Sequence, residues 1–111
     1  MLLNKHCAIV DIETTGGNHK HCHITEFAVL QWQTDGSLIP HEQLINPQQK
    51  IPVFISQLTG IDDVMVVHQP SFEEVAFGLQ RLLEDHVFIA HNVRFDYGFI
   101  KRQLADSGIE F

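Results

Sequence analysis

The sequence predicts a single α/β domain whose sheet contains strands of both directions. Three apolar, strand-like segments come first, and an Asp-Gly dipeptide typical of hairpin turns joins the second to the third. Strands joined by such a turn are antiparallel. Amphipathic helical segments then lead to a fourth short apolar segment, and a helical crossover of this kind sets that strand parallel to an earlier one, here the first. The 111 residues form one domain, 1–111, with no repeat or linker.

The first three strands are predicted from apolar runs and from alternation. His6–Glu13 is almost entirely apolar before its last acids. Ile24–Gln33 alternates between two faces, which places Phe27 on the opposite face from Ile24. The Asp-Gly turn then leads to a third strand around His41–Asn46. Together these segments are expected to form an antiparallel meander.

Two helices are predicted from their proline, glycine and capping signals. Pro52–Leu58 has proline in its first turn and Gly60 just past its end. Ser71–Glu74 is a capping box, in which the Ser hydroxyl and the Glu carboxylate satisfy exposed backbone N–H groups at a helix start. The helix that follows carries an apolar stripe made of Val75, Leu79, Leu82 and Leu83.

The last part of the chain combines a short strand with a final helix. Val87–Asn92 is predicted as a buried strand, and Arg94–Gly108 as an amphipathic helix. The helices would flank the sheet. The core is expected to contain most of the aromatic residues, which have strand or helix spacing, namely Phe27, Trp32, Phe72, Phe77, Phe95 and Phe99.

The composition is that of an ordinary soluble globular protein, with 44% hydrophobic and 19% charged residues. No apolar stretch approaches the ~20 residues that a membrane-spanning helix needs, so no membrane contact is expected. The N-terminal residues lack the features of a secretory signal. Cys7 and Cys22 have no CxxC spacing, so reduced thiols and a cytoplasmic location are expected.

The net charge of −7 limits how this protein could hold a polyanion. Proteins that bind nucleic acid through counterion release alone are basic, and this chain is not. Any polyanionic substrate must therefore be held by something more local than a basic surface. Bound divalent cations would serve, because they can be the largest local charges in a site.

Three carboxylates occupy positions where they could hold such cations. Side chains alternate along a strand, so Asp11 and Glu13 share one face at the end of the first strand. Asp96 follows the fourth strand, which is expected to lie beside the first, and open α/β sheets bind ligands at these strand ends. Carboxylate oxygens without Cys or His suit Mg²⁺ or Mn²⁺. The alternative is that the strand simply ends in solvent and both of its acids are ordinary surface groups.

Several motifs in this order resemble those of the DnaQ-like (DEDD) 3′–5′ exonucleases, the family of the proofreading epsilon subunits of bacterial DNA polymerase III. Asp11–Gly16, DIETTG, looks like the first motif, and His91–Asp96, HNVRFD, looks like the second. The segment between them is also similar, at 45–52 (INPQQKIP), 58–61 (LTGI) and 70–72 (PSF). The resemblance covers essentially the whole chain and implies an RNase H-like fold.

The resemblance also implies a two-metal mechanism with two Mg²⁺ or Mn²⁺ ions. By position, Asp11 would bridge both ions, Glu13 would hold the ion that carries the attacking water, and Asp96 would hold the other. These three residues are the expected catalytic and metal-binding groups. The residues expected to contact or border the substrate are Thr14, Thr15, Gly16, Leu58, Thr59, His91 and Asn92.

The implied activity is removal of nucleoside 5′-monophosphates from a DNA 3′ end during proofreading or repair, with a DNA polymerase as a further expected partner. An RNA-trimming exoribonuclease of the same superfamily is an alternative, because nothing in the sequence reads the 2′-hydroxyl. A third alternative is a non-catalytic module that binds metal or a partner protein.

The family also has a third motif, with a fourth Asp and a preceding His or Tyr, beyond a fifth strand. The chain ends at Phe111, before that motif, and Asp106 cannot replace the fourth Asp because it lies at the far end of the helix that Asp96 begins. We therefore expect an incomplete domain, lacking the fifth strand and the final helices, whose own activity is weak or absent. The uncovered edge of Val87–Asn92 is then expected to pair with a second copy in a homodimer.

The segment His19–His23, HKHCH, is dense in potential transition-metal ligands. A solvated loop bordering the cleft is the favoured interpretation, because adjacent residues rarely bind one ion without partners elsewhere in the chain.

Overall fold

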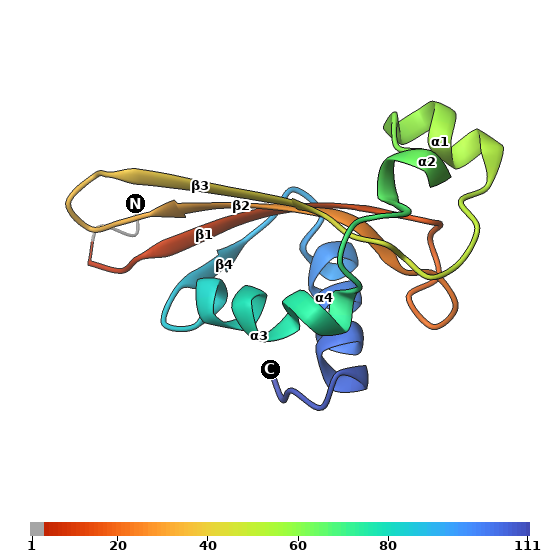
Figure 1. Cartoon of the computed structure of the whole chain (residues 1–111). Coiled ribbons are helices and arrows are strands. Elements are labelled where there is room, and N and C mark those ends of the chain that lie inside the picture. The colour runs from red at the N-terminus through yellow and green to blue at the C-terminus, as the bar shows by residue number, and fades with distance from the viewer. Residues whose placement is uncertain (1–3) are drawn as a thin grey trace.

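The computed structural model describes residues 4–111 and is built around a mixed four-stranded sheet. The strands lie in the order β3-β2-β1-β4 (Figure 1). Their bounds are Cys7–Thr14 for β1, Ile24–Trp32 for β2, Leu38–Leu44 for β3 and Val87–Ile89 for β4.

The strand directions confirm the predicted topology. β1 pairs antiparallel with β2, and β2 pairs antiparallel with β3, which makes the meander. β4 returns to pair parallel with β1, with Cys7 opposite Val87 and Ile9 opposite Ile89. The sheet therefore brings the carboxyl ends of β1 and β4 to the same side, as a parallel crossover requires.

Four helices complete the described chain: α1 (Val53–Thr59), α2 (Asp63–Val66), α3 (Phe72–Leu83) and α4 (Val93–Asp106). Figure 1 shows α3 and α4 on one face of the sheet, whereas α1 and α2 lie beyond one of its ends. The predicted cap of α3 is present, because the side chain of Ser71 accepts a hydrogen bond from the backbone N–H of Glu74. No helix within residues 4–111 has the length and apolar character needed to cross a membrane.

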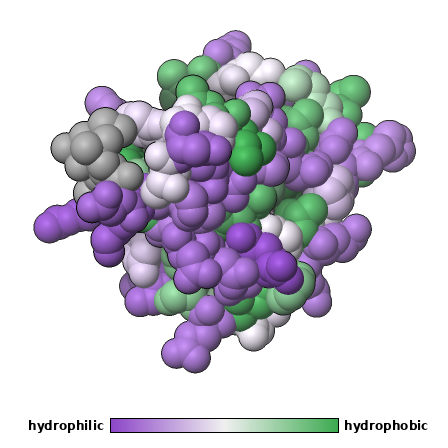
Figure 2. Space-filling view, turned by 90° about the vertical axis from the view of Figure 1, so that its left-hand side faces the viewer, coloured by the Kyte–Doolittle hydropathy of each residue, from purple (hydrophilic) through white to green (hydrophobic). Residues whose placement is uncertain are grey.

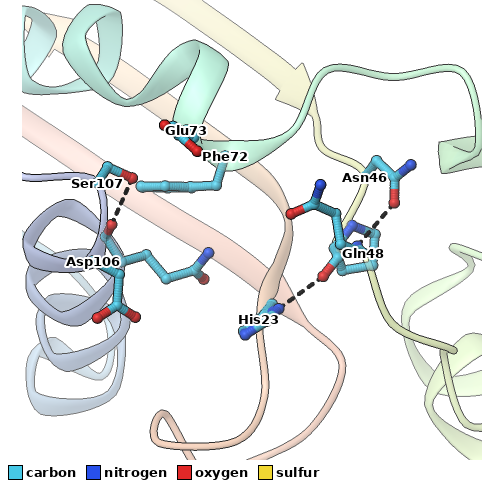
Figure 3. Close-up of a pocket in the computed structure, with 9 residues that line it drawn as sticks. His23, Asn46, Gln48, Phe72, Glu73, Asp106 and Ser107 are labelled. Carbon is cyan, nitrogen blue, oxygen red and sulfur yellow. Dashed lines mark hydrogen bonds between the residues drawn. The ribbon is translucent and has the colours of Figure 1, made fainter.

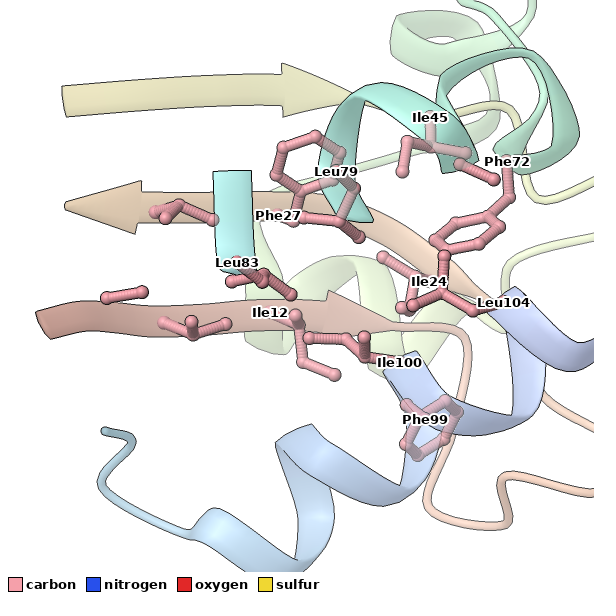
Figure 4. Close-up of a cluster of buried hydrophobic side chains, with 14 residues drawn as sticks. Ile12, Ile24, Phe27, Ile45, Phe72, Leu79, Leu83, Phe99, Ile100 and Leu104 are labelled. Atoms are coloured by element: carbon pink, nitrogen blue, oxygen red, sulfur yellow. The ribbon is translucent and has the colours of Figure 1, made fainter. Parts of the chain in front are cut away.

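The main core lies between the sheet and the helices α3 and α4 (Figure 4). β1 contributes alternate residues to it, so that Val10 and Ile12 are buried while Asp11 is exposed. α4 contributes a fully buried stripe at helical spacing, formed by Phe99, Ile100 and Leu104. A second, smaller core of Ile51, Ile55, Ile61 and Val66 holds α1 and α2 together.

The boundaries of two predicted strands were wrong. β3 begins at Leu38, directly after the hairpin turn, and ends before Asn46, because its pairing with β2 continues from that turn. β4 ends at Ile89, so Ala90 to Asn92 leave the sheet. The short helix α2 was not predicted; its signal was Asp62, whose side chain accepts a hydrogen bond from the backbone N–H of Met65.

A β-bulge changes the expected facing of one core residue. Glu26 lies opposite Glu13 and Ile24 lies opposite Thr14, so Thr25 is an extra residue in β2. The bulge turns Ile24 into the core, on the same side as Phe27, rather than onto the opposite face. The buried amide side chain of Gln103 accepts a hydrogen bond from the Ile24 backbone N–H at 2.7 Å, which ties the bulge to α4.

Two of the aromatic residues expected in the core do not belong to it. Trp32, the last residue of β2, is only half-buried and lies outside the core cluster. Phe77 lies on the outer side of α3 and is 63% exposed, with the Arg81 guanidinium 5.8 Å from its ring centroid. The end of the molecule seen in Figure 2 has a largely polar surface on which apolar side chains are scattered.

Candidate active site

The end of β1 presents two acids on the face of the sheet that the core does not use. Asp11 is exposed and Glu13 is half-buried, whereas Val10, Ile12 and Thr14 are buried. This alternation is the one that the sequence predicts for a strand with one face in the core. Glu13 also has a direct cross-strand neighbour of the same charge, Glu26 on β2.

Asp96 approaches these acids from α4. The helix begins at Val93, four residues after β4 ends, and β4 lies parallel to β1, so the first turn of α4 is carried toward the end of β1. Asp96 is only 5% exposed. The backbone amide of Ile12 lies close enough to the Asp96 carboxylate to favour its charged form. The fold therefore brings the third acid to the same end of β1.

The electrostatics of Glu13 reflect this gathering of like charges. Burial raises the pKa of Glu13 above its ordinary value, and the charges of Asp11, Glu26 and Asp96 raise the pKa further. The pKa of Glu26 is raised in the same direction by burial and by the charges of Glu42 and Asp11. A band of carboxylates thus extends from the end of β1 across β2 to β3.

Different neighbours shift the pKa of Asp96 in opposite directions. Burial raises its pKa, and the negative charge of Asp11 raises it further. The backbone amides of Asp96 and Ile12, together with the charge of His91, act in the opposite direction, but the net shift remains upward. Asp96 and Glu13 are therefore acids whose charged forms lack a sufficient positive partner in the protein itself.

The chemistry of these donors fits a divalent cation. Carboxylate oxygens are the ligands that Mg²⁺ and Mn²⁺ prefer, and a cation would relieve the repulsion that raises both pKa values. Within residues 4–111, no three His, Cys, Asp or Glu side chains lie close enough together to form a complete metal site. The three acids thus lie close enough for their charges to repel one another, but they are not packed tightly around one common position.

A mostly apolar pocket of about 240 Å³ lies directly beside Glu13. One wall is the end of β1 and the turn that follows it, and the other wall is α1. Leu58 is at its edge, with 80% of its surface exposed. The lining consists of Ile12, Glu13, Thr14, Gly16, Gly17, Ile55, Leu58, Thr59 and Phe95. An apolar pocket next to a cluster of acids suits a ligand with one apolar and one charged end.

The side chains of the turn after Glu13 are used within the protein. The Thr14 hydroxyl donates to the Gly16 carbonyl oxygen at 2.7 Å. Thr15 is 3% exposed, and its hydroxyl donates to the Gln49 side chain while accepting from the backbone N–H of His23. A Cβ at Gly16 would lie 2.7 Å from the Cys22 sulfur, so a side chain there would require Cys22 to move. This turn therefore presents backbone, rather than hydroxyl groups, to the pocket.

The other expected substrate residues lie in two places. Thr59 lines the pocket with Leu58, although its hydroxyl donates to the Ile55 carbonyl oxygen at 2.9 Å. His91 and Asn92 are exposed at the start of α4, next to Asp96, and are not part of the pocket lining. The structure thus places Leu58 and Thr59 at the pocket, and His91 and Asn92 on the side where α4 begins.

The residues of the HKHCH segment turn toward different partners. The His19 ring lies edge-on to Phe99, with ring centroids 6.1 Å apart, and Cys22 packs against Gly16. The Nδ1 atom of His23 is 2.7 Å from the Pro47 carbonyl oxygen. Both cysteines carry free thiols. These side chains are thus used in separate contacts within the protein.

Several residues near the site were not identified from the sequence. The register of β1 and β2 places Glu26 opposite Glu13, but no local sequence signal fixes that register. The spacing of α1 could have placed Ile55 on the same side as Thr59. Gln49 had no sequence signal, because its role depends on contacts with segments far away in the chain.

Proteins of known sequence support a nuclease assignment. The chain is 36% identical over 104 residues to a protein named 3′-5′ exonuclease DinG from Staphylococcus epidermidis, covering 94% of this chain and 12% of that protein. It is 38% identical over 103 residues to the protein of the same name from Bacillus subtilis, covering 92% of this chain and 11% of the relative. The chain thus spans about one eighth of the length of these relatives.

Solved structures confirm the RNase H-like fold. E. coli exonuclease I in complex with a dT13 oligonucleotide superimposes with a TM-score of 0.84 at 16% identity, over 96% of this chain and 25% of that one. Apo exonuclease I gives the same TM-score at 17% identity, over 96% of this chain and 26% of that one. At this level of identity the likeness is one of fold.

The family model RNase_T, described as Exonuclease, matches residues 8–109. The match includes all three acids, the turn after Glu13 and the whole of α4. This chain therefore belongs to the RNase_T exonuclease family.

Proposed function

We propose that this chain is a 3′–5′ exonuclease domain that acts on DNA. The observation that carries the proposal is the position of Asp11, Glu13 and Asp96, three mutually repelling carboxylates at the end of β1, beside an apolar pocket. A phosphodiester next to a terminal base has the matching combination of a charged and an apolar part. The name of the DinG relatives supports the 3′–5′ exonuclease activity, and the dT13 oligonucleotide bound to exonuclease I supports DNA as the substrate.

In this proposal Asp11, Glu13 and Asp96 hold two Mg²⁺ or Mn²⁺ ions. Such ions, when bound, supply charge neutralisation at the phosphate and an activated water for in-line displacement. The acids themselves direct the cations to the end of β1, and the buried Asp96 fixes one side of that position. This local positive charge would allow a protein with a net charge of −7 to hold a polyanion.

The pocket would receive the 3′-terminal nucleotide. Its apolar walls, from Ile12 and Phe95 on one side and Ile55 and Leu58 on the other, would pack against the base and the sugar. Glu13 lines the same pocket, so the linkage to the preceding nucleotide would lie next to the acids. The glycines at 16 and 17 would let the chain backbone approach the nucleotide closely.

Proofreading or repair in the cytoplasm, with a DNA polymerase as partner, is the biological setting that we propose. We also propose that the outer edge of β4 contacts a second copy of the chain. Val87, Phe88 and Ile89 are half-buried, and no other described strand pairs with that edge. Light scattering at high concentration tests the dimer, and a monodisperse monomer would refute it.

The activity is tested by incubating the chain with 5′-labelled single-stranded DNA and RNA oligonucleotides of one sequence, with Mg²⁺ or with EDTA. The expected result is slow, stepwise shortening of the DNA from its 3′ end that EDTA prevents, in keeping with the weak activity expected of this chain. Faster shortening of the RNA would favour the exoribonuclease alternative. If neither strand is shortened while calorimetry detects Mn²⁺ binding that Asp11→Ala abolishes, the chain is a metal-binding module and the proposal is wrong.

A further inference from the structure

We propose that Gln49 is a positioning residue that sets the separation between the two walls of the pocket beside Glu13. The inference rests on the proposed function, since it concerns how the site holds a terminal nucleotide. It starts from the hydrogen bonds of a single side chain that joins two segments distant in sequence, the loop after β1 and the segment before α1.

The two walls of the pocket have no common strand or helix. The first wall is the end of β1 and the turn through Gly17, which the sheet holds in place. The second wall is α1, which lies beyond the end of the sheet (Figure 1) and packs on the small core that it shares with α2. Sheet pairing does not extend to α1. Leu44 of β3 packs against the small core, and a polar contact between the segments that carry the two walls adds to that link.

Gln49 provides this contact. It lies in the segment between β3 and α1, three residues before Pro52, the residue that precedes the first turn of α1. Its Oε1 atom accepts a hydrogen bond from the Thr15 hydroxyl, and its Nε2 atom donates to the His21 carbonyl oxygen at 3.1 Å. Both polar ends of the side chain are thus used to hold the segment that leads into α1 against the segment that leaves β1.

Thr15, which donates to Gln49, is itself held in place by two further hydrogen bonds. The backbone N–H of Thr15 donates to the His23 carbonyl oxygen at 2.9 Å, and the Thr15 hydroxyl accepts from the His23 backbone N–H at 3.0 Å. Thr15 is buried and follows Glu13 by two residues. A displacement of Thr15 would therefore move the backbone of the acid and of the pocket wall together.

The fold has a second link between the same segments, so loss of Gln49 should not unfold the chain. His23 Nδ1 and the Pro47 carbonyl oxygen are 2.7 Å apart, and the Gln48 backbone N–H donates to the Asn46 side chain at 2.9 Å. Figure 3 marks a hydrogen bond at His23 and one between Gln48 and Asn46. These bonds anchor the segment before Gln49 independently of its side chain. The substitution can therefore be tested in a folded protein.

The test compares Gln49→Met with Gln48→Met in the whole chain. Methionine has nearly the shape of glutamine but forms neither hydrogen bond, and Gln48 is an exposed neighbour whose side chain is outside the pocket lining. Steady-state shortening of a deoxythymidine pentamer with Mg²⁺ gives KM and kcat. Hydrogen exchange of the Thr15 and His23 amides, measured by NMR, gives a readout that does not depend on activity.

For Gln49→Met we expect KM to rise roughly tenfold, as the loss of two neutral hydrogen bonds implies, with kcat changed less than about threefold. The Thr15 and His23 amides should exchange faster, and Gln48→Met should match the wild type in all three measurements. If the wild type is active but Gln49→Met leaves KM or the amide exchange unchanged, this inference is wrong and the proposed function is unaffected. A wild type without nuclease activity would overturn the proposed function, and this inference would fall with it.

Discussion

One face of β1 packs Val10 and Ile12 into the core, while the other face presents Asp11 and Glu13 at the end of the sheet. The buried face stabilises the fold, because each large apolar side chain removed from water contributes about 1.5–3 kcal/mol. The acidic face opposes folding: Glu13 stands directly opposite Glu26, and like charges in that position destabilise a sheet by roughly 0.2–1 kcal/mol.

Alternate residues of the same strand thus have different roles: the buried apolar residues stabilise the fold, and the acids between them serve the proposed chemistry. The core holds the strand rigidly enough to keep unfavourable charges close together, and those charges are what a cation would need. Changes on the two faces should therefore have separate effects, one on activity and one on stability, and four predictions test this separation.

The largest expected effect is on activity. Asp11→Asn should lower nuclease activity by at least about 10³-fold, because it removes a charge that the proposed cations require at the reacting phosphate. Thermal unfolding should be unchanged or slightly higher, since Asp11 is exposed and repels its neighbours. Oligonucleotide assays and melting curves of the same preparation check both halves.

The matched control is Asp85→Asn. Asp85 lies in the turn that precedes β4, whereas the acids of the site lie near the carboxyl ends of β1 and β4. Asp85 is exposed and has a φ of 60°, a conformation that Asn adopts readily. This variant should retain wild-type activity. Equal losses in the two variants would mean that Asp11 has no special role.

The second effect is on stability. Ile100 is fully buried on α4, one turn after Asp96, and Ile100→Ala should lower the free energy of unfolding by about 2–5 kcal/mol through the cavity that it leaves. Its kcat should stay near that of the wild type at temperatures where the variant is folded. Denaturant unfolding together with kinetics checks this.

Ile39→Ala is the control of the same chemistry at an exposed site. Ile39 is 43% exposed on the edge strand β3, and its truncation should change stability by no more than about 0.5 kcal/mol. A similar loss in both variants would contradict the placement of the core.

The third effect is the pH dependence of metal binding. Cations and protons compete for Glu13 and Asp96, and burial and neighbouring charges raise both pKa values, so protons should begin to displace the metal at a higher pH than from ordinary carboxylates. As the pH falls toward the raised pKa values, the apparent Mn²⁺ affinity should fall by up to about tenfold per pH unit for each proton taken up. Calorimetry at a series of pH values checks this, and an affinity that does not change as the pH is lowered would contradict it.

The smallest effect is a gain in stability from Glu26→Gln. The pKa of Glu26 is raised in the folded protein, so the folded state binds its proton more tightly than the unfolded chain does. Stability from this group is complete below its ordinary pKa and is lost as the pH rises through the raised value. The variant avoids that loss and should be more stable by roughly 0.5 kcal/mol at neutral pH.

At low pH, where Glu26 is protonated in both states, the advantage of Glu26→Gln should disappear. Melting curves at several pH values measure it. A gain that persists at low pH would show that its cause is packing and not charge.

The chain topology was predictable from local patterns. The apolar run of β1, the Asp-Gly turn and the Ser71 cap each depend on neighbours within a few residues, and the structure confirms all three. The short strand β4 was placed correctly beside β1, but its end was not, because the pairing with β1 stops at Ile89.

The site was predictable to the extent that it follows alternation and order along the chain. Asp11 and Glu13 share a face because they are two residues apart in a strand, and Asp96 begins the helix after the neighbouring strand. Glu26 was missed because the register between β1 and β2 is set only when the two strands pair, and the long loop between them does not fix it.

The sequence by itself determined which residues alternate, which helix ends are capped and in what order the elements follow, since these depend on interactions between near neighbours in the chain. Only the tertiary structure decided that Ile24 turns into the core, that three acids share one electrostatic environment, and that Gln49 joins the two walls of the pocket. These features depend on contacts between residues 20 or more positions apart, which appear only when the sheet and helices have packed together.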